Sequence, residues 1–253
     1  MKSLLMQNAL LKMSWVEFKL FLREPASAFF TLIFPLIYLF IYGMISGNQP
    51  SPMYGGARTL DAAIPSLTAA VICMAGLMPI TITMATYREK GILRRLRSTP
   101  LSPLVVLAAQ VVVVLTMTFL SMLLLVLAGK VFYQVSFPGN AFSMLACFLL
   151  GSLSFFGIGF ILAGTMPTVR SAWVAAMALL YPMLLLSGAF FSVEVMPAII
   201  QKISAFIPLT YVVNLLRGLW MGEAWSQHTL DVLVLAVMLV VGVFATIKTF
   251  RWE

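Results

Sequence analysis

Residues 104–127 read LVVLAAQVVVVLTMTFLSMLLLVL, and the chain carries no charge between Ser98 and Gly129. A helix needs roughly 20 predominantly apolar residues to cross the hydrocarbon core of a bilayer. A strand of a membrane barrel would instead alternate apolar and polar residues over about 10 positions. Because this run is continuous, it predicts a membrane-spanning α-helix.

Similar runs recur along all 253 residues. Hydrophobic residues make up 62% of the chain and charged residues 9%, whereas soluble domains are about 45–50% apolar and about 25% charged. We therefore predict an all-α integral membrane protein, with residues 1–253 forming one transmembrane domain. Its six expected spans lie at about 26–45, 62–87, 104–127, 141–166, 172–190 and 230–247.

The basic residues between the spans favour one orientation. Cytoplasmic loops carry an excess of Lys and Arg, and an even number of spans puts both termini on one side. We expect a multi-pass protein of the bacterial cytoplasmic (inner) membrane with both termini in the cytoplasm. The net charge of +8 lies in the connections, so it does not indicate nucleic-acid binding. The expected inner side holds Lys2, Lys12, Lys19, Arg23, the cluster at 88–97, Arg170, Lys248 and Arg251, and the outer side holds Arg58, Lys130, Lys202 and Arg217.

Residues 1–24 form an amphipathic segment before the first span. Apolar residues at spacings of four, three and four make one helical stripe, with cations on its flank. This pattern predicts a helix in the membrane interface, with its cations directed toward anionic phospholipid headgroups. The alternative is an amphipathic helix packed on the protein's own spans, and both can hold in part. The stripe is Leu11, Trp15, Phe18 and Leu22, and the cations are Lys12, Lys19 and Arg23.

Residues 192–222 fit neither a span nor a simple loop. They contain two apolar helical candidates, at 197–207 and 209–220, divided by Pro208. Each is shorter than the roughly 17 residues that a crossing requires. We predict a re-entrant helical hairpin on the outer side, whose turn must be covered by protein or water. Its charges, Glu194, Lys202 and Arg217, are expected to be solvated ends of short helices.

Motifs for catalysis or phosphate binding are absent from the sequence. It has no GxxxxGK[ST] loop, and the glycines at 157–159 lie inside an apolar run. His228 and Asp231 are expected to mark the polar entrance of the last span, while Cys73 and Cys147 read as small buried apolar residues. No predicted span has an ionisable residue near its centre, which disfavours a proton or ion relay. We expect no catalytic, metal or cofactor site on this chain.

Charge is instead concentrated in the basic loop, residues 87–103, which read YREKGILRRLRSTPLSP. Its apolar residues share one side of a short helix, and Pro100 ends that helix. A charge cluster that only sets topology needs cations, but it needs neither the Glu-Lys-Gly turn nor the Thr-Pro-Leu-Ser-Pro exit. The loop is therefore expected to bind anionic lipid or a groove in a partner protein.

The segment R-E-K-G-x-L-x-R-L-R-x-T-P-L-S-P, residues 88–103, resembles the first cytoplasmic loop of type-2 ATP-binding-cassette (ABC) exporter permeases. The F-x-R-E-P segment at 21–25 is similar to that family too. The tail agrees through LSGAFFS at 186–192, Met-Pro at 196–197, PLTY at 208–211 and LRG at 216–218. Ser192 departs from the proline that many relatives place there. The form of the loop is closer to the drug and antibiotic branch than to the polysaccharide branch.

The resemblance implies a half-size permease that forms a homodimer and binds a separate ABC ATPase subunit, which would hold ATP and Mg. Residues 88–99 would be the coupling helix, the N-terminal helix would lie at the inner interface, and 192–222 would help form an outer gate. The implied coupling residues are Arg88, Glu89, Lys90, Gly91, Leu93, Arg94, Arg95, Leu96, Arg97, Thr99 and Pro100. The implied interfacial residues are Trp15, Phe18, Lys19 and Arg23, and the implied gate residues are Glu194, Pro197, Pro208, Tyr211 and Arg217.

The cargo that these features favour is an amphipathic drug, antibiotic or lipid, moved outward from the cytoplasm or the inner leaflet. Polysaccharide or ion-linked export is the alternative, and a secondary transporter without an ATPase is a weaker one. A membrane-embedded enzyme is disfavoured by the absence of catalytic motifs. Methionines can line an adaptable path, or they can simply pack; the candidates are Met74, Met78, Met84, Met177 and Met183.

Overall fold

The computed structural model describes residues 2–51, 56, 58–97 and 103–249. Within these ranges the chain is helical, and the β-type pairing is a single isolated bridge between Pro50 and Arg58. Among the described residues, six helical stretches are long and apolar enough to cross a membrane, which confirms the predicted all-α membrane fold. They are Phe29–Ser46, Thr59–Glu89, Val105–Tyr133, Ala141–Thr165, Val169–Leu186 and Trp225–Lys248.

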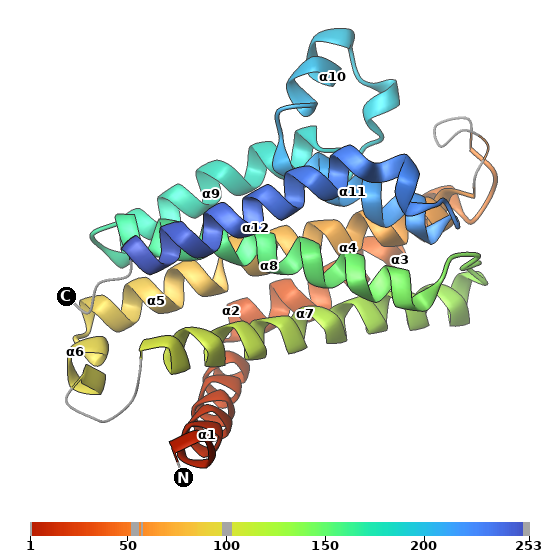
Figure 1. Ribbon diagram of the computed structural model, residues 1–253. Helices are drawn as coiled ribbons and strands as arrows, with labels where there is room; N and C mark the ends of the chain where they lie inside the picture. The colour runs from red at the N-terminus through yellow and green to blue at the C-terminus, as the bar shows by residue number, and fades with distance from the viewer. Residues whose placement is uncertain (1, 52–55, 57, 98–102, 250–253) are drawn as a thin grey trace.

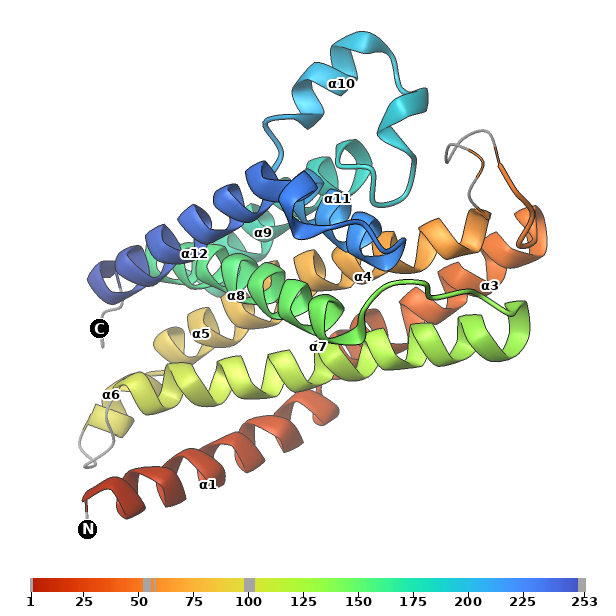
Figure 2. The same cartoon turned by 45° about the vertical axis from the view of Figure 1, so that its right-hand side comes forward.

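The spans run side by side as a bundle (Figures 1 and 2). α6, the α8–α9 connection and the last turn of α12 gather at one end of it, and α10 stands off its side. The helices are α1 (Lys2–Arg23), α2 (Pro25–Ala28), the π-helical η1 (Phe29–Ile33), α3 (Phe34–Ser46), α4 (Thr59–Leu77), α5 (Pro79–Glu89), α6 (Ile92–Arg97), α7 (Pro103–Tyr133), α8 (Ala141–Thr165), α9 (Val169–Leu186), η3 (Val193–Val195), α10 (Ala198–Ser204), α11 (Pro208–Trp220), η4 (Trp225–His228) and α12 (Thr229–Thr249).

Polar side chains define where two of these helices begin. The Asn140 side chain accepts hydrogen bonds from the backbone N–H groups of Phe142 and Ser143 at the start of α8. Thr168 and Ser171 form a reciprocal capping box at the start of α9. Such caps satisfy N–H groups that have no partner within the helix. After Leu186 the chain turns at Gly188, whose φ is +88°, so the fifth span ends before the predicted residue 190.

The α4–α5 span is the centre of the bundle. It is 78% buried, whereas the first, fifth and sixth spans are each 22% buried. α4 packs against α3, α7, α8, α9 and α11. Pro79 opens α5 at its first turn, where a missing backbone N–H is tolerated, and separates α5 from α4 at Met78. Cys73 and Cys147 are both buried free thiols, as predicted.

Glycines allow the closest helix crossings. A Cβ on Gly157 would lie 2.9 Å from the Cα of Gly242, where α8 crosses α12. A Cβ on Gly159 would lie 2.1 Å from the carbonyl oxygen of Gly76, where α8 crosses α4. Small residues let membrane helices approach to backbone contact. The glycines at 157–159 therefore serve packing, consistent with their position in an apolar run.

The two short helices predicted within 192–222 are present; their insertion from the outer side stays a prediction. α10 and α11 lie at 91° to each other, with Pro208 as the first residue of α11. α11 buries most of its length against α4, α8, α9 and α12, whereas α10 is largely exposed. The chain thus bends where Pro208 cannot extend a preceding helix.

Candidate functional site

The basic loop forms a helix that packs on the bundle through apolar side chains, Leu93 and Ile92 among them. α5 ends at Glu89, Gly91 takes a φ of +66° that favours glycine, and α6 follows. Leu93 is 2% exposed and packs in a cluster with Tyr87 and Phe160. Lys90, Arg94 and Arg95 are exposed. The predicted coupling residues Leu96 and Arg97 lie within α6 but their side chains are not described, and Thr99 and Pro100 lie outside the described residues.

Arg88 and Glu89 bind the connection between α8 and α9. Arg88 Nη1 donates to the carbonyl oxygen of Gly164 at 3.2 Å, near the C-terminal end of α8. The backbone N–H of Val169, the first residue of α9, donates to Glu89 Oε2 at 2.7 Å. A cation at a helix C-terminus and an anion at an N-terminus both complement the helix dipole. The sequence suggested these residues only as partner contacts; here they also link the α5–α6 turn to the α8–α9 connection.

Glu89→Ala is expected to lower the free energy of unfolding by about 0.5–1 kcal/mol, because the N-terminus of α9 loses its anionic cap. Glu89→Gln keeps an acceptor oxygen and should cost less. Thermal unfolding of the purified chain in detergent measures both. Equal stability of Glu89→Ala and wild type would show that this contact contributes nothing.

α1 presents two different faces. Trp15, Lys19 and Arg23 are exposed, the Trp15 and Phe18 rings stack at 5.7 Å, and Lys19 Nζ lies 5.1 Å from the Trp15 ring centroid. Phe18 and Phe21 pack in a cluster with Val113 and Met117 of α7, and α1 lies beside α7. The helix is thus packed on the protein's own spans by one face, which includes Phe18 of the predicted stripe. Leu11, Trp15 and Leu22 of that stripe are exposed. Contact of that stripe with lipid remains a prediction.

Glu17 is a buried acid that the sequence reasoning missed. Its side chain is 2% exposed and accepts a hydrogen bond of 2.7 Å from the Tyr87 hydroxyl, so it links α1 to α5. Burial raises the pKa of Glu17, and the hydrogen bond from Tyr87 offsets this only in part. Burying a carboxyl removes the hydration of its charged form, which costs free energy. A buried carboxyl with a shifted pKa is therefore a candidate functional group. The signal available in the sequence was the position of Glu17 in the amphipathic helix, away from the predicted lipid-facing stripe, where it can face the protein's own spans.

Glu17→Gln is expected to stabilise the chain more at about pH 8 than at about pH 5. The pKa of Glu17 is higher in the folded chain than in the unfolded chain. The wild-type fold therefore loses stability as the pH rises from the unfolded pKa through the folded pKa, because the buried carboxyl becomes charged. Glutamine keeps an acceptor for Tyr87 and carries no charge. The difference in thermal midpoint between variant and wild type, measured at both pH values, tests this. A difference independent of pH would contradict it.

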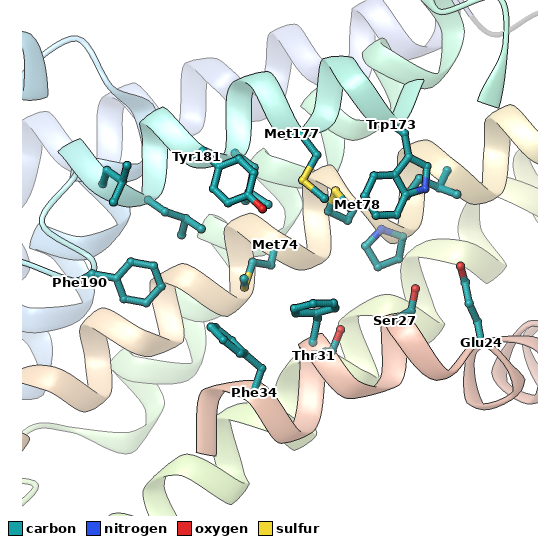
Figure 3. A pocket seen from close by; sticks show the side chains of 16 residues that line it. Glu24, Ser27, Thr31, Phe34, Met74, Met78, Trp173, Met177, Tyr181 and Phe190 are labelled. Atoms are coloured by element: carbon teal, nitrogen blue, oxygen red, sulfur yellow. The ribbon is translucent and has the colours of Figure 1, made fainter. Parts of the chain in front are cut away.

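An apolar cavity of about 360 Å³ opens where α2, η1, α3, α4, α5 and α9 meet. Figure 3 shows sulfur-containing and aromatic side chains that face one another across it. Met74, Met78 and Met177, three of the five predicted path methionines, line the cavity, whereas Met84 and Met183 are buried in core clusters. The π-helical η1 contributes Phe30 and Thr31, and π-turns are frequent at functional sites. The other prominent lining residues are Glu24, Ser27, Phe34, Trp173, Tyr181 and Phe190.

At the other end of the bundle, Arg217 is the hub of a polar network. Its Nη2 donates to Ser66 Oγ at 3.1 Å and to the carbonyl oxygen of Gly188 at 3.3 Å, and its Nη1 lies 3.9 Å from Glu194 Oε1. The Arg217 side chain is only 19% exposed, so the expectation of a solvated helix end was wrong for it. That expectation is confirmed for Glu194 and Lys202, which are exposed. The cause is that α11 lies against α4, which the sequence does not reveal.

The remaining predicted gate residues shape the same region. Ser192 is buried and donates its hydroxyl to Glu194. Burial raises the pKa of Glu194, but this hydrogen bond and Arg217 outweigh it and lower the pKa below its usual range. Pro197 precedes α10, and the Tyr211 hydroxyl donates to the carbonyl oxygen of Ala205 at 2.6 Å. The Tyr211 contact links α11 to the end of α10.

His228 has more partners than the sequence indicated. Its Nδ1 lies 2.9 Å from Asp231 Oδ2, as expected for a polar entrance to α12. Its Nε2 lies 2.8 Å from Glu223 Oε2, a contact that the sequence reasoning did not foresee. No group of three acidic, His or Cys side chains in the described part of the chain has the geometry to hold a metal ion. The contacts of His228 with Glu223 and Asp231 join the connection between α11 and α12 to the start of α12.

These features define a multi-pass membrane protein with a basic helix at one end, a broken helix pair near the other and an apolar cavity within the bundle. Residues 8–221 match the family model described as ABC-2 type transporter. The chain belongs to the ABC-2 type transporter family, which confirms the resemblance of the loop and tail motifs.

Curated relatives agree with this assignment. The chain is 23% identical over 161 residues to "Probable multidrug ABC transporter permease YbhR" of Escherichia coli (strain K12), covering 64% of this chain and 44% of that protein. It is 28% identical over 163 residues to YbhS of the same organism, covering 63% and 42%. It is also 28% identical over 204 residues to "Putative transport permease YvfS" of Bacillus subtilis (strain 168), covering 79% and 81%. The match thus spans less than half the length of either E. coli relative.

Proposed function

We propose that this chain is the membrane subunit of an ATP-driven exporter. Two copies would form the pathway, and a separate ABC ATPase subunit, carrying ATP and Mg, would dock on α6 in the cytoplasm. The sequence of this chain has no phosphate-binding loop of its own. Family membership supports a permease role, and the outward-facing cations of α6 support a docked partner.

The observation that carries the proposal is the path from α6 to the cavity. α5 has 11 residues, which is about 16 Å of rigid helix. Pro79 at its start lines the cavity, and Glu89 at its end leads into the turn before α6. Leu93 fastens α6 to the same core cluster as Met84 of α5. Movement of α6 by a partner would therefore reach the cavity lining without an intervening flexible loop.

The cavity supports an amphipathic drug, antibiotic or lipid as cargo, taken from the cytoplasm or inner leaflet and moved outward. Its volume of about 360 Å³ lies within the range of small-molecule sites, about 300–1,000 Å³. Methionine surfaces accommodate varied ligands. YbhR and YbhS are named as probable multidrug permeases, which also supports this class of cargo. In this scheme the Arg217 network and the α10–α11 pair form the outer gate, and α1 lies at the inner membrane surface.

The test is co-expression of this chain with the ABC ATPase subunit encoded nearest to it, followed by affinity purification and reconstitution into vesicles. We expect the two to co-purify and ATP hydrolysis to drive accumulation of amphipathic compounds. A neutral sugar polymer serves as the contrasting cargo. Failure of every candidate ATPase to bind the chain, or transport that continues without ATP, would contradict the proposal.

A further inference from the structure

A second cavity, of about 290 Å³, lies beside the first between α1, α5, α6 and α7. The two cavities share Glu24 and Ile82 in their linings. The first is walled mainly by aromatic rings and methionines, whereas the second combines apolar side chains with polar ones, including Glu17, Thr86, Lys90 and Gln110. The second cavity, called the polar chamber below, is thus the more polar of the two, and the two cavities meet at Glu24.

The polar chamber contains a buried hydrogen-bond acceptor that has no donor among the described residues. Gln110 is 3% exposed, and its Oε1 has no hydrogen-bond partner among the described residues. A buried polar atom without a partner is rare in folded proteins and calls for an explanation. Glu17 is 2% exposed and accepts a hydrogen bond from the Tyr87 hydroxyl. An occupant that donates hydrogen bonds would pair with Gln110, and one that carries positive charge would also offset the charge of Glu17.

Glu24 stands where such an occupant would pass between the chambers. It is exposed, and Figure 3 shows its side chain at one end of the apolar cavity, extended from the ribbon toward Trp173. Ser27 and Thr31 follow it along the same side of the chain. Among side chains that the structure describes, neither Glu17 nor Glu24 has a basic partner within 4.0 Å. Lys90, in the wall of the polar chamber, is the opposing charge there.

We propose that the cargo of this permease is a hydrophobic cation, whose charge is recognised by Glu24 at the mouth of the polar chamber and whose apolar body fills the methionine-lined cavity. This proposal rests on the proposed function and names its substrate class. Trp173 and Tyr181 present aromatic faces that attract a cation. The same carboxylate rejects anions of equal size, because specificity depends on repulsion as well as attraction.

The probes that separate charge from shape are tetraphenylphosphonium and tetraphenylborate, a cation and an anion of nearly the same size. Binding of each to the full chain in nanodiscs is measured by equilibrium dialysis, with empty nanodiscs as the blank. We expect the cation to bind at least about tenfold more tightly than the anion. Glu24→Gln should weaken cation binding about tenfold, the scale of one lost charge partner. Glu223→Gln, which changes an exposed carboxylate on the α11–α12 connection, is the matched control and should change neither affinity.

Equal binding of the two ions to the wild-type chain, or no binding of the cation, would overturn the inference without recourse to any variant. So would unchanged cation binding by a folded Glu24→Gln protein. The proposed function is judged separately, by ATP-driven transport in the reconstituted complex. ATP-driven transport of neutral or anionic amphipaths without charge preference would reject the cation and keep the exporter. A cation preference without any ATP-driven transport would reject the exporter instead.

Discussion

Replacing Arg94 and Arg95 together by glutamate is expected to reduce ATP-driven transport to background while the chain stays folded. Both side chains are exposed on α6, and α6 is held by Leu93 on its other side. Reversing exposed charges changes little in the packing of the chain, but it places repulsion where a partner surface must dock. Transport and ATP hydrolysis are measured side by side in vesicles that contain the ATPase subunit.

The matched control for this variant is Lys130→Glu, which reverses an exposed cation in the last turn of α7, at the opposite end of that helix from α6. It should transport normally. Thermal unfolding of both variants checks that the fold is retained. A contact that transmits motion must bind one state of the partner better than the other, and reversing both charges should disrupt such a contact. Full transport by the Arg94/Arg95 variant would therefore reject α6 as the coupling element.

Gly159→Val is expected to destabilise the chain by about 3 kcal/mol or to prevent its folding. The added Cβ would fall 2.1 Å from the carbonyl oxygen of Gly76, a backbone atom in the most buried span. Overpacking typically costs about 1–3 kcal/mol, and more when the backbone itself must move. The same change would displace the hydrogen bond that Thr81 donates to the carbonyl oxygen of Gly159. Thermal unfolding and the yield of monodisperse protein measure the effect.

Ala178→Val on the exposed face of α9 is the matched control for added volume. It should change stability by less than about 0.5 kcal/mol, as is usual for surface substitutions. Wild-type stability of the Gly159→Val protein would mean that α8 and α4 do not approach as closely as the helix crossing requires.

The presence of the membrane-spanning helices could be predicted from the sequence, because each span is encoded locally by a continuous run of apolar residues. The broken pair α10–α11 was equally visible, since Pro208 divides two stretches too short to cross. The arrangement of the spans was not predictable. The span at 105–133 is the more apolar, yet 39% of it is buried, compared with 78% of the Thr59–Glu89 span. In a bilayer, hydropathy reports contact with lipid as well as with protein, so it does not identify the central helix.

For the candidate site, the basic loop could be identified from its own residues, but its internal contacts could not. Glu89 and Val169 are 80 residues apart in sequence, and no local pattern pairs a carboxylate with a distant helix end. The cavity could not be predicted either, because its lining residues are also far apart in the sequence. Met74 and Met177 line it, and Met84 and Met183 do not, because α2, η1, α5 and α9 converge only in the folded chain.

The burial of Cys73 and Cys147 makes the native chain a nearly silent background for thiol labelling. Buried structural thiols react poorly, since the thiolate is the reactive form and needs access to water. A single cysteine introduced at an exposed position such as Arg94 or Lys202 would then be the main target of a membrane-impermeant maleimide. The sidedness of each end of the bundle could be read from intact cells against inverted vesicles, without first replacing any natural residue.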